Sequence, residues 1–415
     1  MPPSPHPDAR PGAGAWLVVA LLVPVALLNY LDRQMLASMK FSVMADLPGI
    51  AREARWGTVL AVFKWVYALA SPFGGFLADR YSRRHVIAGS LWVWSLVTWM
   101  TGHVTTYEQL VAARALMGVS EALYLPAALA LVADVHAGAT RSRAVGVHQM
   151  GIYLGALLGG FGGYAAESPA IGWRAAFAAC GAAGAAYAVP LFVLLRLAPR
   201  DATRGPVAAL GGALGELART PSFLLLVAYF TLPAIAAWVV RDWMPAILKA
   251  EFGIGQGAAG VSATLYWQSA AIVGAVLGGW LADRWTRRTP RGRIHVSALG
   301  MTLIVPAMFG VGYAPASGAL WVAVAFLVLF GLGWGCFDAN NMPILAQIVR
   351  PPLRATGYGV MNLVSIGAGG FADWGFGALR DRRVPLFGIF SAFASAALLS
   401  VALVLLIRPR DTESV

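Results

Sequence analysis

Long apolar runs recur along the whole chain, and they limit its possible folds more than any other feature of the sequence. Many of these runs reach about 20 residues, the length that an α-helix needs to cross the hydrocarbon core of a bilayer. Within that core every backbone N–H and C=O group needs a partner in the protein, so only helices and closed barrels span it. The short alternating segments of barrel strands are absent from the sequence. We therefore predict an all-α polytopic membrane protein.

The composition is that of a membrane protein rather than a soluble one. Of the 415 residues, 59% are hydrophobic and only 12% are charged, whereas soluble proteins carry about 25% charged residues. The net charge of +12 does not indicate nucleic acid as a partner, because the basic residues are spread over short loops between the apolar runs. Cys180 and Cys336 both fall inside predicted spans, so we expect no disulfide, no metal site and no cofactor.

The apolar runs divide into twelve predicted spans. Residues 1–14 are rich in proline and lack the pattern of a cleavable signal peptide, so the first run is expected to remain as span 1. An even number of spans places both termini on the same side of the membrane. The predicted spans are 15–37, 56–78, 86–104, 109–133, 144–166, 174–197, 221–248, 259–282, 294–313, 318–348, 355–379 and 384–407.

The basic residues of the loops predict on which side of the membrane the two termini lie. Nineteen Lys and Arg residues fall in the termini and in the loops after even-numbered spans, whereas eight fall in the opposite loops. Because basic loops stay in the cytoplasm, both termini are expected there. The compact loops and the Ala-, Gly- and Arg-rich composition favour a bacterial origin, so we expect the cell inner (plasma) membrane.

An internal repeat predicts how the spans are organised. The segment Gly75-Phe-Leu-Ala-Asp-Arg-Tyr-Ser-Arg-Arg recurs 204 residues later as Gly279-Trp-Leu-Ala-Asp-Arg-Trp-Thr-Arg-Arg. A weaker match aligns Gly118-x-x-Glu121-x-x-x-x-Pro with Gly335-x-x-Asp338-x-x-x-x-Pro, in spans 4 and 10. We therefore predict two halves in parallel orientation. The predicted parts are a cytoplasmic tail (1–14), a six-helix bundle (15–197), a cytoplasmic joint (198–220), a second six-helix bundle (221–408) and a second cytoplasmic tail (409–415).

The repeated loops resemble the cytoplasmic loop motif of the major facilitator superfamily, G-x-x-x-D-R-x-[ST]-R-R. Ser82 and Thr286 stand where that family usually has glycine. The resemblance implies twelve helices in two pseudo-symmetric bundles around a central cavity that opens alternately to either side. The repeated Asp and Arg residues lie at helix ends, where charge-assisted hydrogen bonds can join neighbouring helices in one state. The predicted gating residues are Gly75, Asp79, Arg80, Arg83, Gly279, Asp283, Arg284 and Arg287.

Charged residues within spans 1 and 4 are the strongest functional signal. Arg114 and Glu121 are seven residues apart, so both project from one helix face. A charge near the bilayer centre costs at least about 2.5–3.5 kcal/mol, so it needs a partner, water or a substrate. The neighbours Asp32 and Arg33 cannot face each other and need different partners, which spans 1 and 4 can supply to one another. The alternative is a structural ion pair between Arg114 and Glu121.

Further polar residues extend this candidate site. Lys64 in span 2 is either a second positive contact for an anion or a lysine that extends its amine to the membrane interface. Tyr67 and Gln149 can present polar groups to the cavity. Glycines at four-residue spacing in span 5, such as Gly151 and Gly155, predict close helix packing. In the second half, amide and indole groups suit sugar hydroxyls, and the candidates there are Trp267, Gln268, Asp338, Asn340, Asn341 and Asn362.

The charged motifs narrow the resemblance to two branches of the family. Asn29-Tyr30-x-Asp32-Arg33 and Arg114-x-x-x-Gly-x-x-Glu121 are similar to the anion:cation symporters, which take up sugar acids and related organic anions with protons. The resemblance implies that Asp32 and Glu121 carry protons and that Arg33 and Arg114 bind the anion. It also implies that Tyr30, Tyr67, Gln149 and Asn362 line the site, whereas Lys64 and Asp338 depart from the pattern. The same motifs resemble the spinster-type branch, which is linked to lysolipid and sphingolipid transport.

Other classes of protein fit the sequence less well. The six histidines form no metal-binding spacing such as H-E-x-x-H, and there is no G-x-x-x-x-G-K-[ST] phosphate loop. We therefore expect neither an enzyme nor an ATP-driven pump. A sensor with a transporter fold stays open as an alternative. We predict a monomeric proton-coupled symporter for an organic anion, a sugar acid in particular, whose partners are this anion, protons and the lipid bilayer.

Overall fold

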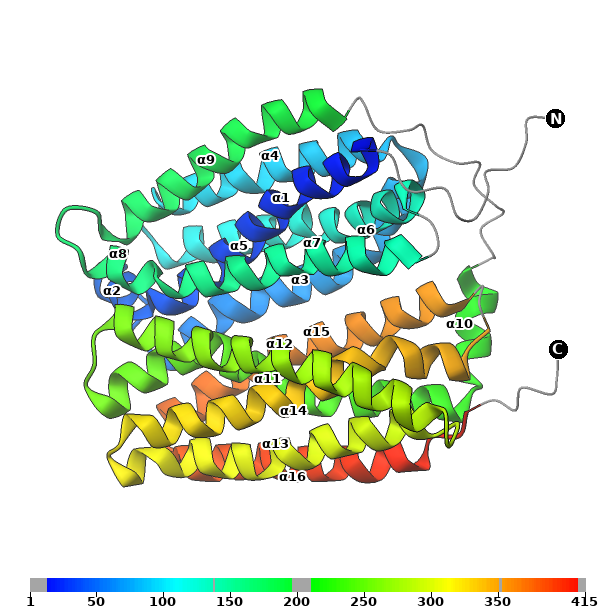
Figure 1. The fold of residues 1–415 in the computed structure, drawn as a ribbon. Coiled ribbons are helices and arrows are strands. Elements are labelled where there is room, and N and C mark those ends of the chain that lie inside the picture. The colour runs from blue at the N-terminus through cyan, green and yellow to red at the C-terminus, as the bar shows by residue number, and fades with distance from the viewer. Residues whose placement is uncertain (1–12, 137–138, 196–209, 351–352, 410–415) are drawn as a thin grey trace. The chain divides into compact units, whose positions relative to one another are not determined.

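The computed structural model describes residues 13–136, 139–195, 210–350 and 353–409 (Figure 1). Residues 1–12, 198–209 and 410–415 of the predicted tails and joint lie outside them. The described residues form helices joined by short turns, and no strand occurs among them, which confirms the predicted all-α fold. The chain divides into two compact units, one of Met1–Ile50 with Val62–Gly205 and the other of Ala51–Ala61 with Pro206–Val415.

The described residues of the first unit form nine helices, counting α3, whose first turns belong to the second unit. Their bounds are α1 Ala13–Ser38, α2 Lys40–Asp46, α3 Glu53–Arg80, α4 Arg83–Thr101, α5 Tyr107–Ala122, α6 Tyr124–Val135, α7 Ala139–Gly160, α8 Gly162–Glu167 and α9 Gly172–Leu194. The most extensive packing joins α1 to α7 and α4 to α9.

Glycines allow α7 to approach α1 closely. A Cβ atom placed on Gly151 would stand 2.6 Å from the carbonyl oxygen of Val23, and one on Gly159 would stand 2.6 Å from that of Leu31. Both distances are too short for a real carbon, so only glycine permits this contact. The close packing that the four-residue spacing predicts is therefore confirmed.

The sequence predicts span 4 as one continuous helix, but the structure breaks it at Leu123. Pro126 has no N–H group to donate to the carbonyl of Ala122, and α5 accordingly ends at Ala122 before α6 begins at Tyr124. The break follows Glu121 directly. The backbone hydrogen bonds are interrupted at Leu123, so Glu121 lies in the last turn of α5 and not in the middle of a continuous helix.

The second unit contains the remaining helices. Their bounds are α10 Leu210–Ala218, α11 Pro221–Phe252, α12 Gln256–Thr286, α13 Gly292–Ser317, α14 Leu320–Ile348, α15 Arg354–Asp381 and α16 Leu386–Leu406. Helix α11 shows how the sequence sets an element's ends. Pro221 begins it, where a missing N–H is harmless, and Gly253 ends it with a φ of 66°, a left-handed conformation that glycine adopts freely. Helix α14 packs on both α12 and α13, and α13 packs on α16.

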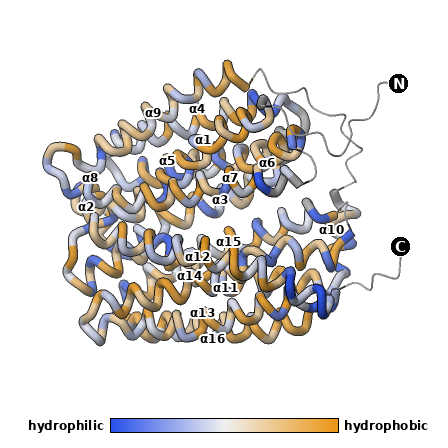
Figure 2. The backbone as a smooth tube through the Cα atoms, viewed as in Figure 1, coloured by the Kyte–Doolittle hydropathy of each residue, from blue (hydrophilic) through white to orange (hydrophobic). Residues whose placement is uncertain are grey.

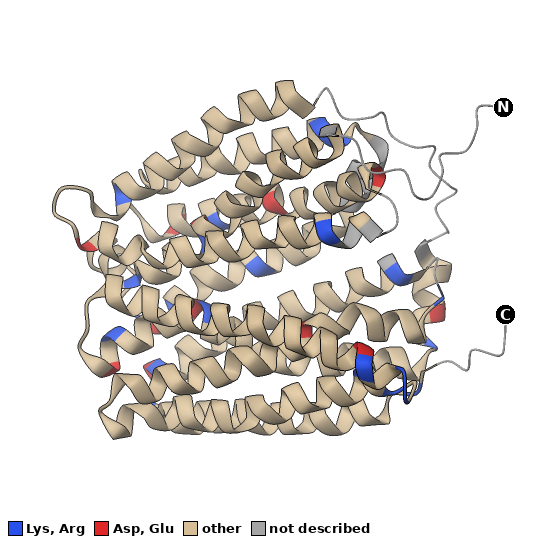
Figure 3. Cartoon of the chain, viewed as in Figure 1, with Lys and Arg blue, Asp and Glu red and all other residues tan. Residues whose placement is uncertain are grey.

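The long helices are consistent with the twelve predicted spans, with α5–α6 and α7–α8 each forming one span. Nine helical stretches of the described residues are long and apolar enough to cross a membrane. The other three, α3, α4 and α15, have 28, 19 and 28 residues, which suffices for length, but they are more polar. Hydrophobic residues run along the helices of each unit, whereas a few charged residues lie midway along them (Figures 2 and 3).

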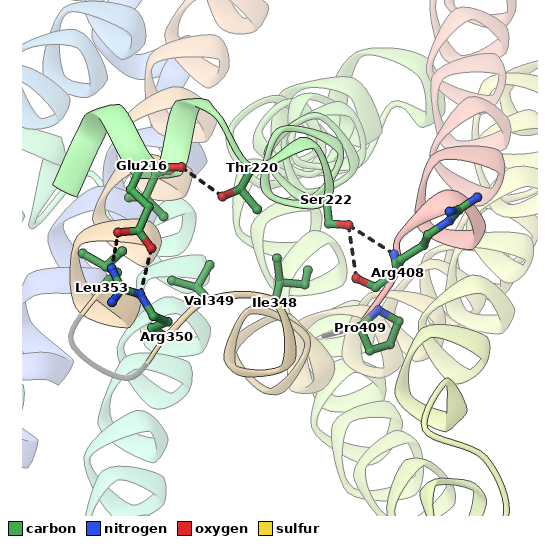
Figure 4. A pocket seen from close by; sticks show the side chains of 10 residues that line it. Glu216, Thr220, Ser222, Ile348, Val349, Arg350, Leu353, Arg408 and Pro409 are labelled. Carbon is green, nitrogen blue, oxygen red and sulfur yellow. Dashed lines mark hydrogen bonds and ion pairs between the residues drawn. The ribbon is translucent and has the colours of Figure 1, made fainter. Parts of the chain in front are cut away.

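A small cavity in the second unit lies where α10 meets α11 and the end of α14 (Figure 4). Its volume of about 120 Å³ is below the roughly 300–1,000 Å³ of small-molecule sites. Arg350 donates to both carboxylate oxygens of Glu216, and these hydrogen bonds raise the pKa of the Arg350 guanidinium above its ordinary value. The Ser222 hydroxyl binds the backbone of Arg408. The first contact joins α10 to the segment after α14, and the second joins α11 to the segment after α16.

Helix α5 also approaches α3 through a glycine, and this contact is testable. A Cβ atom on Gly118 would stand 2.7 Å from the carbonyl oxygen of Phe63. We predict that Gly118→Ala separates the helices and costs about 1–3 kcal/mol of stability, measured as a lower melting temperature in detergent. Gly89→Ala is the control, since a Cβ at Gly89 meets nothing within 4 Å. Equal melting temperatures for the two variants would contradict the predicted close contact.

Candidate functional site

Two ion pairs join α1 to α5 inside the first unit. In the tighter pair, Nη2 of Arg33 lies 2.5 Å from Oε2 of Glu121, and Nε of Arg33 donates to the same oxygen at 2.7 Å. The Glu121 side chain is fully buried, whereas the Arg33 side chain is 13% exposed. Arg33 is thus the more accessible member of the pair.

The second pair is looser and more deeply buried. Nη1 of Arg114 lies 3.7 Å from Oδ1 of Asp32, with 3% and 1% of the two side chains exposed. The Thr98 hydroxyl, from α4, donates to the other oxygen of Asp32. Asp32 and Arg33 therefore have different partners on α5, as their adjacent positions predict. Arg114 and Glu121 each bind a residue of α1 rather than one another, which is not the structural pair considered as the alternative.

Aromatic rings surround the guanidinium of Arg33. Its central carbon lies 4.8 Å from the ring centroid of Tyr30, 4.6 Å from that of Phe63 and 5.1 Å from that of Tyr67. The guanidinium carbon of Arg114 also lies 4.6 Å from the Phe63 centroid. Cations are attracted to aromatic faces, by about 2 kcal/mol where water is excluded. The two arginines thus share one ring.

Each carboxylate keeps one oxygen that accepts no hydrogen bond from the part of the chain that the structure describes. These are Oε1 of Glu121 and Oδ1 of Asp32. A buried carboxylate that is incompletely hydrogen-bonded has a strong tendency to take up a proton or to keep its cation close. Protonation of Glu121 would remove the charge that holds Arg33 and leave the guanidinium to attract an anion. The arrangement can therefore couple protonation of Glu121 to the binding of an anion at Arg33.

Two other predicted residues of the first half, Lys64 and Gln149, belong to neither of the two ion pairs. Lys64 is buried next to Phe63 in α3, and its role in anion binding stays a prediction. Gln149 is half-buried in α7. Its neighbour His148 is buried, with Nε2 2.8 Å from the hydroxyl of Tyr124.

Sequence reasoning misses four residues of this region, namely Phe63, Thr98, Tyr124 and His148. A phenyl ring or a hydroxyl group in an apolar span carries no charge to mark it. The one available signal is position, because Phe63 precedes Lys64 and stands one turn before Tyr67.

The candidate residues of the second unit lie on α12, α14 and α15. Trp267, Gln268, Asn340 and Asn341 are buried, whereas Asp338 is exposed and Asn362 half-buried. Among the described residues, Oε1 of Gln268 and Oδ1 of Asn340 find no hydrogen-bond donor. Buried amides without partners cost about 1–3 kcal/mol each, so water or a ligand hydroxyl would stabilise them. Arg241 of α11 lies 5.8 Å from the Trp267 ring centroid.

The repeated loops form ion pairs within their own units. Asp283 of α12 accepts a 2.6 Å hydrogen bond from Arg293 of α13. In the first unit, Arg83 forms an ion pair with Asp134 of α6 and donates to the carbonyl of Ala130. Arg284 and Arg287 are exposed. The side chains of Gly75, Asp79 and Arg80 lie outside the described part. Gating by these residues stays a prediction.

Comparison with known proteins identifies relatives along nearly the whole chain. The sequence profile of the Major Facilitator Superfamily matches residues 22–373. An MFS-type efflux pump of Mycolicibacterium smegmatis is 30% identical over 410 residues, covering 96% of this chain and 91% of that protein. Protein spinster homolog 1 of Bos taurus is 28% identical over 399 residues, covering 88% of this chain and 73% of that protein.

A solved structure has the same fold. It is a bacterial homolog of the human lysosomal transporter Spinster, in an inward-facing and unoccupied conformation. Its TM-score is 0.76 at 19% identity, with 95% of this chain and 96% of that chain covered. At this identity the likeness concerns the fold alone.

Phe63 is testable as a shared contact of the two arginines. We predict that Phe63→Leu destabilises the protein by about 1–2 kcal/mol more than Phe177→Leu does, because it removes cation–π contacts as well as apolar surface. Phe177 is a matched control, since it is fully buried in α9 and its ring contacts Trp173. The measurement is the unfolding midpoint in a denaturing detergent series. Equal losses in the two variants would show that the ring only fills space.

Proposed function

Because this chain belongs to the Major Facilitator Superfamily, we propose that it is a proton-coupled secondary transporter of an organic anion. It is a membrane-spanning transporter and not an enzyme. The observation that carries the proposal is the pair of buried salt bridges, Arg33–Glu121 and Arg114–Asp32. Two cations and two carboxylates inside one apolar bundle cost free energy of desolvation. That cost favours a role for their charges in the transport cycle.

The ion pairs support a simple coupling mechanism. With Glu121 ionised, its carboxylate occupies Arg33, and an anion would compete with it for the same guanidinium. With Glu121 protonated, Arg33 keeps its place among Tyr30, Phe63 and Tyr67 and attracts the anion instead. Asp32, held by Thr98 and Arg114, provides a second position for a proton. Binding of both ligands then leaves the bundle with fewer unpaired charges, which favours the change of state.

Two classes of anion are candidates for the substrate. Relatives named spinster support an amphiphilic anion such as a lysolipid, the class that the resemblance to the spinster-type branch implies. The buried amides of Gln268, Asn340 and Asn341 support a sugar acid, whose hydroxyls would satisfy them. We propose the lysolipid-like anion first, because the similarity to the spinster proteins extends over most of the chain.

We also propose the membrane orientation that the loop charges predict, with both termini in the cytoplasm of a bacterial inner membrane and a monomer as the working form. A protein with a transporter fold that acts only as a sensor is the remaining alternative. Counterflow separates the two, because a carrier exchanges labelled for unlabelled substrate across the membrane and a sensor does not.

Glu121→Gln tests the proposed coupling. The neutral amide mimics a protonated carboxyl group, so we predict that accumulation driven by a pH gradient falls at least about tenfold while substrate exchange persists. Glu108→Gln is the control, because Glu108 lies in the first turn of the same helix and is exposed. The measurement is uptake and exchange in proteoliposomes. Accumulation with an ordinary pH dependence in Glu121→Gln would exclude this residue as the coupling site.

The same proteoliposomes distinguish the substrates. We predict uptake of lysophosphatidylglycerol under an inward proton gradient and its loss in Arg33→Gln, since the guanidinium faces the anion. D-Glucuronate is tested in parallel with D-glucose as its uncharged counterpart. Transport of D-glucuronate alone would replace the lysolipid by the sugar acid, and transport of neither anion would contradict the proposed function.

A further inference from the structure

The second unit repeats the geometry of the charged site, and the sequence repeat shows which positions correspond. Phe63 and Trp267 each precede the repeated glycine by 12 residues, at Gly75 and Gly279. The aromatic residue that contacts both arginines in the first unit thus has an aromatic counterpart in the second.

The helices that carry these rings pack closely against a glycine-bearing helix in both units. A Cβ on Gly118 of α5 would clash with the carbonyl oxygen of Phe63 in α3, and a Cβ on Gly331 of α14 would clash with that of Trp267 in α12. Gly335 makes the same close approach one turn later, to the carbonyl of Ala271. Gly118 and Gly335 are each followed three positions later by an acidic residue, Glu121 and Asp338.

An arginine from the first long helix of each unit completes the arrangement. Arg33 of α1 lies 4.6 Å from the Phe63 centroid, and Arg241 of α11 lies 5.8 Å from the Trp267 centroid and 5.0 Å from that of Trp238. Arg241 also attracts the carboxylate of Asp338 electrostatically, whereas Arg33 and Glu121 form a direct ion pair. An arginine, an aromatic ring and an acid therefore recur on equivalent helices.

The two arrangements differ in how exposed their residues are and in the side-chain length of the acidic residue. Glu121 is fully buried, whereas Asp338 is exposed and has a side chain one methylene shorter. Arg241 is half-buried and stacks on indoles, which attract cations more strongly than a phenyl ring does. The second arrangement is thus more open to a soluble or amphiphilic ligand than the first.

We propose that Arg241, Trp267 and Asp338 form a second anion site in the second unit, in which Arg241 binds the negatively charged group of the substrate. Trp267 positions the guanidinium, and Asp338 competes with the anion for it. The ligand is a phosphate or carboxylate group on a small or amphiphilic molecule. The proposal rests on the proposed function and extends it by assigning a binding role to Arg241.

The test measures the binding of charged and uncharged probes to the purified full-length protein. The probes are lysophosphatidylglycerol against the uncharged monoacylglycerol, and D-glucuronate against D-glucose. We expect Arg241→Gln to weaken binding of the anionic probe roughly 10- to 100-fold and to leave the uncharged partner within about twofold. Asp338→Asn should act in the opposite direction and tighten anion binding severalfold.

Control variants separate a binding role from a structural one. Arg174→Gln removes another guanidinium that stacks on an indole, 4.4 Å from the Trp173 centroid, and should not change anion affinity. Arg241→Lys keeps the positive charge and should retain most of the affinity. If Arg241→Gln does not fold, the increase expected for Asp338→Asn decides the question.

The outcomes distinguish this inference from the proposed function. Wild-type protein that binds an anionic probe, with unchanged affinity in Arg241→Gln and Asp338→Asn, contradicts the second site and leaves the proposed function standing. Equal losses for charged and uncharged probes in Arg241→Gln indicate a structural role and also overturn the inference. Wild-type protein that binds neither anion contradicts both.

Discussion

The first unit depends on the neutralisation of four charges inside an apolar bundle. Nη2 of Arg33 lies 2.5 Å from Oε2 of Glu121, and Nη1 of Arg114 lies 3.7 Å from Oδ1 of Asp32. Removing one partner would leave an uncompensated buried charge, at a cost of about 3–5 kcal/mol. Glycines allow close packing of the helices around these side chains. Gly118 lets α5 approach α3, and the glycines of α7 let that helix approach α1.

The repeat shows how one scaffold carries different chemistry in its two halves. The glycine contacts and the position of the acid are kept, whereas Phe63 becomes Trp267 and buried Glu121 becomes exposed Asp338. The first half therefore holds its arginine in a tight ion pair, and the second half holds Arg241 against indole rings. Close glycine contacts between helices occur in both units, so the difference in chemistry lies in the side chains that these helices carry.

Much of the candidate site follows from the sequence, for physical reasons that concern charge. A charged residue in an apolar span needs a partner, so Asp32, Arg33, Arg114 and Glu121 are recognisable without a structure, and the rule that neighbours on a helix face apart assigns Asp32 and Arg33 to different partners. Phe63 and Thr98 carry no such mark. Arg241 has the charge, but only the structure places its guanidinium 5.8 Å from the ring centroid of buried Trp267.

The sequence by itself determined the membrane class, the helical fold, the repeat and the charged residues, because hydrophobic length, periodicity and charge are local properties of the chain. Only the tertiary structure decided that Arg114 binds Asp32 while Glu121 binds Arg33, that both arginines share Phe63, and that α5 ends just after Glu121. These facts depend on which helix faces meet and at what distance. That is set by packing between segments far apart in the chain, where one residue's size, such as the missing Cβ of Gly118, decides the contact.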